Sequence, residues 1–151
     1  QPKPDVYYRT ENGSLARAPV LDTPPLSDYT IALSAERAAL DLFNASPDQT
    51  TDRLWMRWQH LSNARELWAS LDALGFFSAL YEKNQIAILA PTNFGVVVGR
   101  NRRAPVWVVQ FPALLTYRSS SEETTKNVII QLQIHYDHGR FKTQKAWIKS
   151  A

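Results

Sequence analysis

The stretch PVWVVQFPALLTYR at residues 105–118 decides the fold, because its apolar side chains recur at every second position. Side chains alternate between the two faces of a β-strand, so one face of this stretch carries an apolar set: Trp107, Val109, Phe111, Ala113, Leu115 and Tyr117. The stretch TKNVIIQLQIHYD at residues 125–137 repeats the pattern with Val128, Ile130, Leu132, Ile134 and Tyr136. Its alternate positions include Asn127, Gln131, Gln133 and His135. Both stretches predict long strands with one apolar face and one solvated face.

Three more strands are predicted around these two, at residues 85–90, 94–100 and 140–149, where β-branched and aromatic residues are dense. Short polar turns separate the predicted strands, at residues 91–93, 100–103, 119–123 and 137–139. Turns this short join antiparallel strands, so we expect consecutive strands to be antiparallel neighbours in one sheet.

The chain before residue 85 has the three- and four-residue apolar spacing of helices. Ser27 and Asp28 predict the start of a first helix, and Pro47 marks its end. A polar linker at 48–52 is expected to precede a short second helix, whose apolar residues are Leu54, Trp55, Trp58 and Leu61.

A third helix is the most clearly marked of the set. Asn63 and Glu66 have the spacing of a capping box, in which each side chain would bond a backbone N–H of the first turn. Gly75 supplies a stop signal, and residues 76–81 are expected to add a further turn or two.

Helices that precede the strands must cover the apolar face of the sheet. The expected fold class is therefore α+β, with N-terminal helices packed on a curved antiparallel β-sheet in a cone-shaped, nuclear-transport-factor-like fold. Residues 1–26 predict a proline-rich arm with a short hairpin turning at Asn12-Gly13, and residues 27–151 a single α+β domain.

Composition narrows the possible functions. The 151 residues, 44% of them hydrophobic and 21% charged, suit one globular domain. The 17 basic and 14 acidic residues are scattered, so nucleic acid is not indicated as a partner. Because there is no cysteine, disulfides, thiolate zinc sites and thiol nucleophiles are excluded. No stretch reaches the roughly 20 apolar residues of a spanning helix, and a membrane anchor upstream of Gln1 stays possible.

One local cluster suits a metal or an acid–base site, namely His135-Tyr136-Asp137-His138. The strand pattern places His135 on the polar face and His138 in a turn, without a third ligand close in sequence. We expect these to be ordinary surface histidines and predict no metal or cofactor.

The cone-shaped fold also hosts isomerases and dehydratases, which place acids or bases in an apolar pocket. Between residues 85 and 136 the only acidic residues are Glu122 and Glu123, in a serine-rich turn where solvent reaches them. Asp41 and Asp72 are expected on solvated faces of helices. We therefore predict that the chain is not an enzyme, with a small-molecule-binding protein or an enzyme using the cone pocket as the alternative.

Several residues have the composition of a protein–protein interface. Tryptophan and arginine are enriched at interface centres, and an exposed basic turn can meet acidic surfaces. A simpler interpretation is that the tryptophans are buried in the core between the helices and that the arginines lie in a turn exposed to solvent. Tyr7 and Tyr8, in the arm, are expected to dock on a neighbour or on their own domain. The candidate interaction residues are Tyr7, Tyr8, Trp55, Trp58, Arg100, Arg102 and Arg103.

The run from Trp107 to Glu122, WVVQFPALLTYRSSSE, resembles the central strands of the DotI/IcmL/TraM family of type IVB secretion and conjugation systems. The opening segment also resembles that family's lead-in to its first helix, with Tyr7-Tyr8, Asn12-Gly13, Pro19-Val20-Leu21 and Pro25-Leu26-Ser27-Asp28. Ala64-Arg65-Glu66 departs from the glycine–tryptophan start of the family's helix. Of the branches, the sequence is more similar to the conjugative-plasmid TraM type.

The resemblance implies a periplasmic domain that follows one transmembrane helix in the bacterial inner membrane, with the fold of the VirB-type scaffold proteins. It implies a structural assembly component of a type IV secretion system, with itself and other core components as partners and without catalytic residues. A third hypothesis, motivated by the arginine turn, is direct contact with transported nucleic acid, which we expect to be unlikely.

Overall fold

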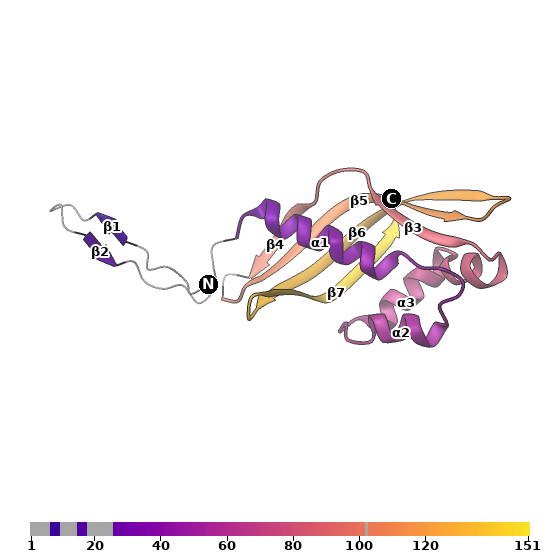
Figure 1. Ribbon diagram of the computed structural model, residues 1–151, viewed down its shortest axis with the longest axis horizontal. Coiled ribbons are helices and arrows are strands. Elements are labelled where there is room, and N and C mark those ends of the chain that lie inside the picture. The colour runs from indigo at the N-terminus through magenta and orange to yellow at the C-terminus, as the bar shows by residue number, and fades with distance from the viewer. Residues whose placement is uncertain (1–6, 10–14, 18–25, 102) are drawn as a thin grey trace.

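The computed structural model describes residues 7–9, 15–17, 26–101 and 103–151. Within this part of the chain, a two-stranded hairpin is followed by three α-helices and then by a five-stranded antiparallel sheet (Figure 1). The predicted α+β class, with helices packed on an antiparallel sheet, is confirmed.

The first two helices begin at hydroxyl caps. Helix α1 (Asp28–Phe43) starts at Ser27, whose side chain accepts a hydrogen bond from the backbone N–H of Thr30 at 3.1 Å, as predicted. Helix α2 (Thr51–Trp58) starts inside the stretch that was expected to be a polar linker. The Thr50 hydroxyl accepts from the backbone N–H of Arg53 at 3.2 Å, and this cap sets the earlier start.

Helix α3 (Ala64–Ala73) is present as predicted, but the capping box is not. Asn63 makes no side-chain hydrogen bond to its helix, and its amide instead bonds the backbone of a strand. The chain leaves the helix through Gly75 at φ 75°, a backbone conformation that glycine adopts without strain. One π-helical turn, η1 (Ser78–Glu82), forms within the expected extension.

The five strands lie within two residues of the predicted ranges. They are β3 (Ile86–Pro91), β4 (Val96–Asn101), β5 (Val106–Arg118), β6 (Glu123–Asp137) and β7 (Arg140–Ser150). The order is β3-β5-β6-β7, and β4 also pairs with β5.

Strands β3 and β4 correct one expectation, because they do not pair with each other although they are consecutive. Both pair antiparallel with β5, β3 along residues 113–118 and β4 along residues 106–110. The 13 residues of β5 are long enough to hold two short strands end to end. The predicted turn at 91–93 is therefore an interruption along one side of β5 and not a reversal of the chain.

The predicted apolar face of the sheet forms the core. On β5, Val109 and Phe111 are at most 1% exposed, and on β6 the same holds for Ile130 and Leu132. Trp107 and Tyr136, at the ends of the two rows, stay partly exposed. The opposite face is less polar than expected, since the register places partly exposed apolar side chains on it, among them Pro112, Leu114, Ile129 and Trp147.

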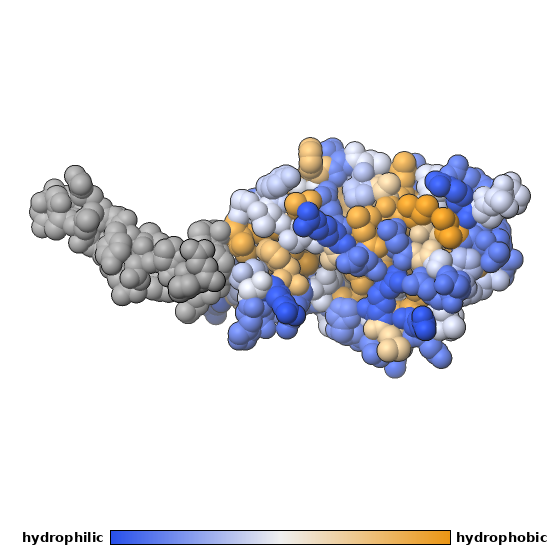
Figure 2. Space-filling model, viewed as in Figure 1, coloured by the Kyte–Doolittle hydropathy of each residue, from blue (hydrophilic) through white to orange (hydrophobic). Residues whose placement is uncertain are grey.

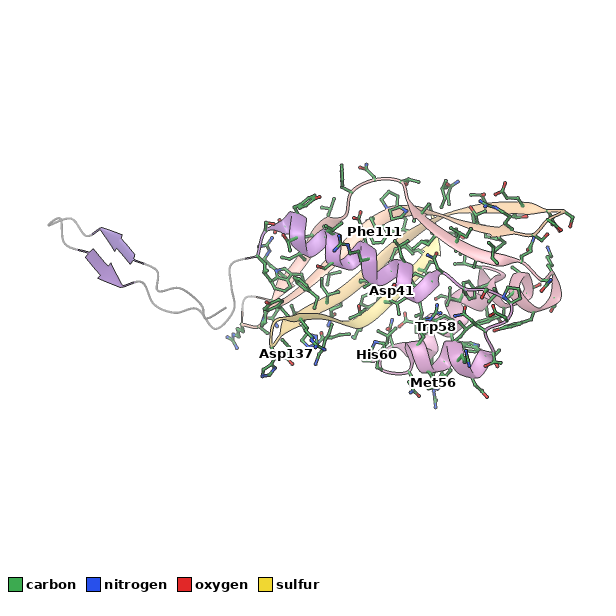
Figure 3. The ribbon with its side chains drawn as sticks, viewed as in Figure 1. Asp41, Met56, Trp58, His60, Phe111 and Asp137 are labelled. Atoms are coloured by element: carbon green, nitrogen blue, oxygen red, sulfur yellow. The ribbon has the colours of Figure 1, made fainter. Side chains whose placement is uncertain are left out.

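Aromatic side chains fill the space between the helices and the sheet. Phe43, Trp58, Phe76 and Phe111 are each at most 1% exposed, and Trp58 and Phe111 are labelled in Figure 3. Among the described residues, Gln85 is the single buried polar side chain. This filled interior is the place where the alternative function would put its ligand.

The chain itself covers two stretches of the sheet's edges. At β7, the backbone N–H of Ser62 donates to the carbonyl of Gln144 at 2.9 Å. Asn63 donates from Nδ2 to the Ala146 carbonyl at 2.7 Å and accepts from its N–H at 3.1 Å. At β3, Ala45 and Ala87 exchange two backbone hydrogen bonds of 3.0 and 2.8 Å.

Two further strands precede the helices. β1 (Tyr7–Arg9) and β2 (Leu15–Arg17) pair antiparallel, with Tyr8 opposite Ala16. In the described part of the chain, none of the helices has both the length and the apolar character needed to cross a membrane.

Candidate interaction surface

Exposed apolar side chains gather beside strand β4. Tyr29 on α1 is 67% exposed, and along the chain around β4 Phe94 is 76%, Val96 61% and Val98 51% exposed. We refer to these four residues as the β4 surface. On the face drawn in Figure 2, apolar side chains are visible where α1 begins and again along β3. A cluster of large exposed apolar side chains is typical of a surface that contacts another molecule.

The backbone around Gly95 positions this surface. A Cβ atom at Gly95 would lie 2.9 Å from Val109 Cγ1 and 3.3 Å from Ala32 Cβ, so only glycine lets β4 lie this close to β5 and α1. A register shift between Val97 and Gly99 then interrupts the pairing with β5. Val98 lies at this bulge and remains half exposed.

A small cleft of about 120 Å³ opens between α1 and the start of β4. Its apolar lining includes Tyr29, Leu33 and Phe94, and its carboxylates are those of Asp28 and Glu36. Glu36 Oε1 accepts a hydrogen bond from the backbone N–H of Gly95 at 3.2 Å. Two carboxylates therefore lie beside Tyr29 and Phe94, and that of Asp28 is paired with Arg100.

The predicted arginine turn follows β4 directly. Arg100 contacts both carboxylate oxygens of Asp28, at 3.1 and 3.3 Å, so its charge is already paired with α1. Arg103 is exposed, and its backbone N–H donates to Asn101 Oδ1 at 2.9 Å. Arg102 lies outside the described residues. Arg100 thus joins the end of β4 to the start of α1.

Trp58 is a core residue and not a surface one, which corrects its selection as an interface candidate. It is 0% exposed, and its indole N–H donates to the Leu42 carbonyl at 2.9 Å. Its ring meets Trp68, Phe76 and Phe77 edge to face, with centroids 5.7–6.1 Å apart. A side chain enclosed in this way cannot touch a partner while the domain is folded.

Trp55 is half-buried and keeps part of its ring at the surface. It packs edge to face on Trp68, with ring centroids 5.8 Å apart. It also borders an open groove of about 600 Å³ between α2, α3 and Lys145. Tyr7 and Tyr8 belong to β1, and their side chains lie outside the description. Trp55 and the β4 surface thus lie on different elements.

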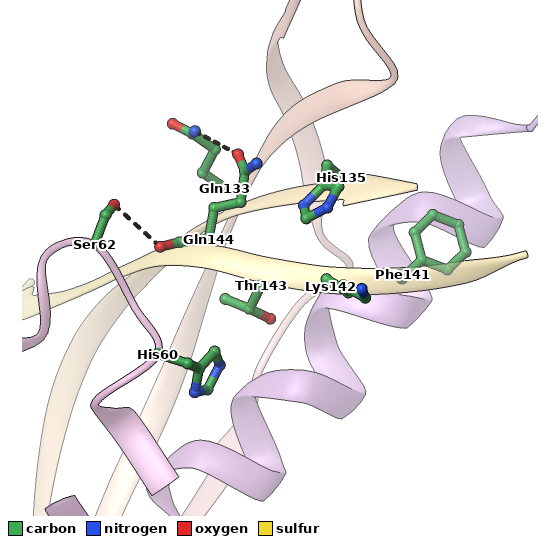
Figure 4. A pocket seen from close by; sticks show the side chains of 8 residues that line it. All are labelled: His60, Ser62, Gln133, His135, Phe141, Lys142, Thr143 and Gln144. Carbon is green, nitrogen blue, oxygen red and sulfur yellow. Dashed lines mark hydrogen bonds between the residues drawn. The ribbon is translucent and has the colours of Figure 1, made fainter. Parts of the chain in front are cut away.

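The histidines do not form one cluster. His138 pairs with Asp137 in the turn between β6 and β7, whereas His135 lines an open pocket of about 660 Å³ together with His60 (Figure 4). This pocket lies at a bulge of β7, where Gln144 Oε1 accepts from Gln133 Nε2 at 2.9 Å. Sequence spacing gave no sign of His60, because it comes from the loop after α2.

Carboxylate and histidine side chains do not gather at one place in the part of the chain that the structure describes. Asp41 and Asp72 are exposed, as expected for solvated helix faces. Within the described ranges there is no group of three or more histidine and carboxylate side chains that could hold a metal ion.

The apolar residues of the β4 surface were not selected from the sequence, since only Arg100 was singled out there. Val96 and Val98 alternate within a predicted strand, and this signal does not say whether the strand is covered. The decisive fact is the position of β4 at an edge, which depends on its pairing with β5.

Comparison with protein families gives one match. The family model described as "Type-IV b secretion system, inner-membrane complex component" (DotI/IcmL) matches residues 1–148. None of the curated protein sequences matches the chain significantly.

Three solved structures have a similar fold. The periplasmic domain of DotI is 20% identical, with a TM-score of 0.67, over 84% of this chain and 98% of that one. An IcmL-like type IV secretion protein from Legionella pneumophila is 11% identical, with a TM-score of 0.68, over 83% and 94%. A periplasmic fragment of TraM is 12% identical, with a TM-score of 0.65, over 79% and 94%. The TraM-type branch stays a prediction.

Proposed function

This chain belongs to the DotI/IcmL family of type-IVb secretion system inner-membrane complex components, and we propose that it acts as a periplasmic assembly domain through protein–protein contacts. The observation that supports contact as its mechanism is the β4 surface, where Tyr29, Phe94, Val96 and Val98 are each more than half exposed. Its partners are further copies of itself and other components of the secretion complex.

The energetics of the β4 surface favour association. Burying one large apolar side chain is worth roughly 1.5–3 kcal/mol, so four such residues supply the apolar centre of an interface. Strand β4 adds backbone groups at a sheet edge, which can pair with an extended segment of a partner. The paired Arg100 and Asp28 lie at the rim, where charges orient a partner more than they strengthen its binding.

The family match supports a location on the periplasmic side of the inner membrane. Its description places the complex in the inner membrane, and two of the similar structures are described as periplasmic. The absence of cysteine is compatible with this compartment and with others.

Small-molecule binding is the second candidate function, and one observation favours it. The open pocket at the β7 bulge has about 660 Å³ and presents His60, His135 and Gln133. Aromatic side chains fill the interior where cone-shaped enzymes hold their substrates, so the second candidate requires this surface pocket instead. A ligand for it would raise the melting temperature in proportion to the logarithm of ligand concentration.

The proposed function is tested by charge substitution on the β4 surface. Val96→Asp should abolish co-isolation of the protein with the inner-membrane complex, because burying an unpaired carboxylate is costly. Met56→Asp on α2 is the matched control, since Met56 is 67% exposed and lies away from β4. Both variants should melt at the temperature of the parent protein.

Two results would oppose the proposal. The first is normal co-isolation and secretion in cells that carry only the Val96→Asp protein. The second is an equal loss with Met56→Asp, which would remove any special role of the β4 surface.

A further inference from the structure

The edge strands of the sheet differ in how far other parts of the chain cover them with hydrogen bonds. Residues Ser62 and Asn63 cover β7 with backbone and side-chain hydrogen bonds, and Ala45 covers β3 with two backbone bonds. Among the described residues, β4 has β5 as its one strand partner and has no comparable cover. Exposed strand edges tend to pair with other chains, so proteins usually block them. An edge left open beside two covered ones is a site for an added strand.

The side chains around this edge define what fits it. An added strand would contact the apolar Phe94, Val96 and Val98 and would approach the carboxylate of Glu36 in the neighbouring cleft. The matching segment is therefore extended, apolar along most of its length, and basic at an end.

The β1–β2 hairpin of this chain has that composition. Its strands read Tyr-Tyr-Arg (7–9) and Leu-Ala-Arg (15–17), so each ends in an arginine. The hairpin is joined by three residue pairs. A two-stranded hairpin of this size is marginally stable alone in water and gains stability when a third strand pairs with it.

The hairpin is drawn away from the sheet of its own chain, which favours a second copy as its partner. Figure 1 shows β1 and β2 lying apart from the five-stranded sheet of their own chain. Residues 18–27 link the hairpin to α1, and these ten residues can span about 33–36 Å when extended. The first residue of α1, Asp28, lies against Arg100 at the end of β4. The link from the hairpin thus joins the folded domain beside the end of β4.

We propose that the β1–β2 hairpin of one copy pairs with the open β4 edge of a second copy. This inference rests on the proposed assembly function and names the segment and the edge that carry its self-association. Exchange of hairpins between two copies occupies both β4 edges, so it forms a closed twofold pair. Each five-stranded sheet then gains two strands.

Cysteine cross-linking tests this directly, because the chain has no cysteine of its own. One sample of the 151-residue chain carries Ala16→Cys and another carries Val98→Cys, with tags of different mass. A short bifunctional thiol reagent is added to the mixture. We expect a mixed cross-linked dimer in severalfold excess over the product obtained when Met56→Cys replaces Val98→Cys.

The double variant Ala16→Cys/Val98→Cys separates the two geometries. At low concentration it should give mainly uncross-linked monomer, and at high concentration cross-linked dimer. Cross-linking within single chains at all concentrations would overturn the proposal in favour of docking on the hairpin's own domain. A mixed dimer no more abundant than with Met56→Cys would overturn it as well. The proposed function is tested separately, by co-isolation of the Val96→Asp protein with the complex, and neither cross-linking result changes the outcome of that test.

Discussion

Tyr117 ties the sheet to the end of the third helix. Its side chain is 3% exposed, and its hydroxyl donates to the Leu74 carbonyl at 2.8 Å. Burial raises the pKa of Tyr117 well above its ordinary value, because the phenolate would lose its hydration inside the core. This residue therefore links stability to pH.

The sign of that link gives a first prediction. The unfolded chain releases the tyrosine proton near pH 10, whereas folded Tyr117 retains it to higher pH. Its contribution to stability is complete below pH 10 and is lost as pH rises above that value, at about 1.4 kcal/mol per pH unit. In Tyr117→Phe, the free energy of unfolding should fall less steeply above pH 10 than in the parent, as measured by urea titration.

Tyr29→Phe is the control for this prediction, since Tyr29 is 67% exposed. Burial also raises the pKa of Tyr81, so the parent keeps a further slope that Tyr117→Phe does not remove. Identical slopes for Tyr117→Phe and the parent would contradict the assignment.

The two tryptophans show where single-residue inference from sequence stops. Trp55 and Trp58 lie three residues apart on α2. Both were interface candidates for the same reason, namely that tryptophan is enriched at interface centres. The structure buries Trp58 completely and leaves Trp55 half exposed. The difference depends on the rotation of α2 against Trp68 and Phe76, which the sequence pattern of an eight-residue helix does not fix.

Among the elements, the strands were predicted best. Apolar residues recur at every second position over residues 107–117 of β5 and 128–136 of β6, and this signal gave the buried face and the ranges to within two residues. The pairing of β3 and β4 with a common partner was missed, because alternation shows that a strand exists and not what it pairs with. The open β4 edge follows from that pairing.

Asn63 gives a prediction about how the elements are joined. Its side chain pairs with the backbone of Ala146 as a neighbouring strand would, at 2.7 and 3.1 Å. Asn63→Ala leaves both backbone groups without this partner and should lower the free energy of unfolding by about 2 kcal/mol. Urea denaturation measures this loss, and hydrogen exchange of the Ala146 amide should become faster.

Ser62→Ala is the matched control, because the Ser62 backbone keeps its bond to Gln144 after the hydroxyl contact at 3.2 Å is lost. Its effect should stay below about 1 kcal/mol. If Asn63→Ala unfolds at the same urea concentration as Ser62→Ala, the Asn63 side chain does not stabilise the contact between α3 and β7.

Gly95 tests the contact between α1 and β4. A methyl group there would meet Val109 Cγ1 at 2.9 Å, so Gly95→Ala should destabilise the domain by about 1–3 kcal/mol. Gly99→Ala is the control, since its nearest atom would be Val108 Cβ at 3.6 Å, an ordinary contact. Thermal melting that is equal for the two variants would show that α1 and β4 pack less closely than described.

For the whole molecule, sequence reasoning reached the fold class and the family but not the surface that carries contact. The α+β class follows from helical spacing before residue 85 and alternation after it. The family resemblance followed from the run between Trp107 and Glu122, and the family match over residues 1–148 confirms it. Surfaces depend on which edges the folded chain covers, and hydrogen bonds between residues far apart, such as Asn63 and Ala146, decide this.

The domain as a whole combines a filled core with one apolar edge. Its interior packs aromatic side chains, and Tyr29, Phe94, Val96 and Val98 remain exposed beside β4. This distribution of apolar surface fits a protein that works by binding other proteins.

Photo-cross-linking in living cells tests this claim most directly. A photoreactive amino acid replaces Val96 in one strain and Met56 in another, and the cross-linked products are identified by mass spectrometry. We expect Val96 to cross-link to a second copy or to another component of the inner-membrane secretion complex, and Met56 to give little of these products. The absence of such products at Val96, or equal amounts at both positions, would contradict the account.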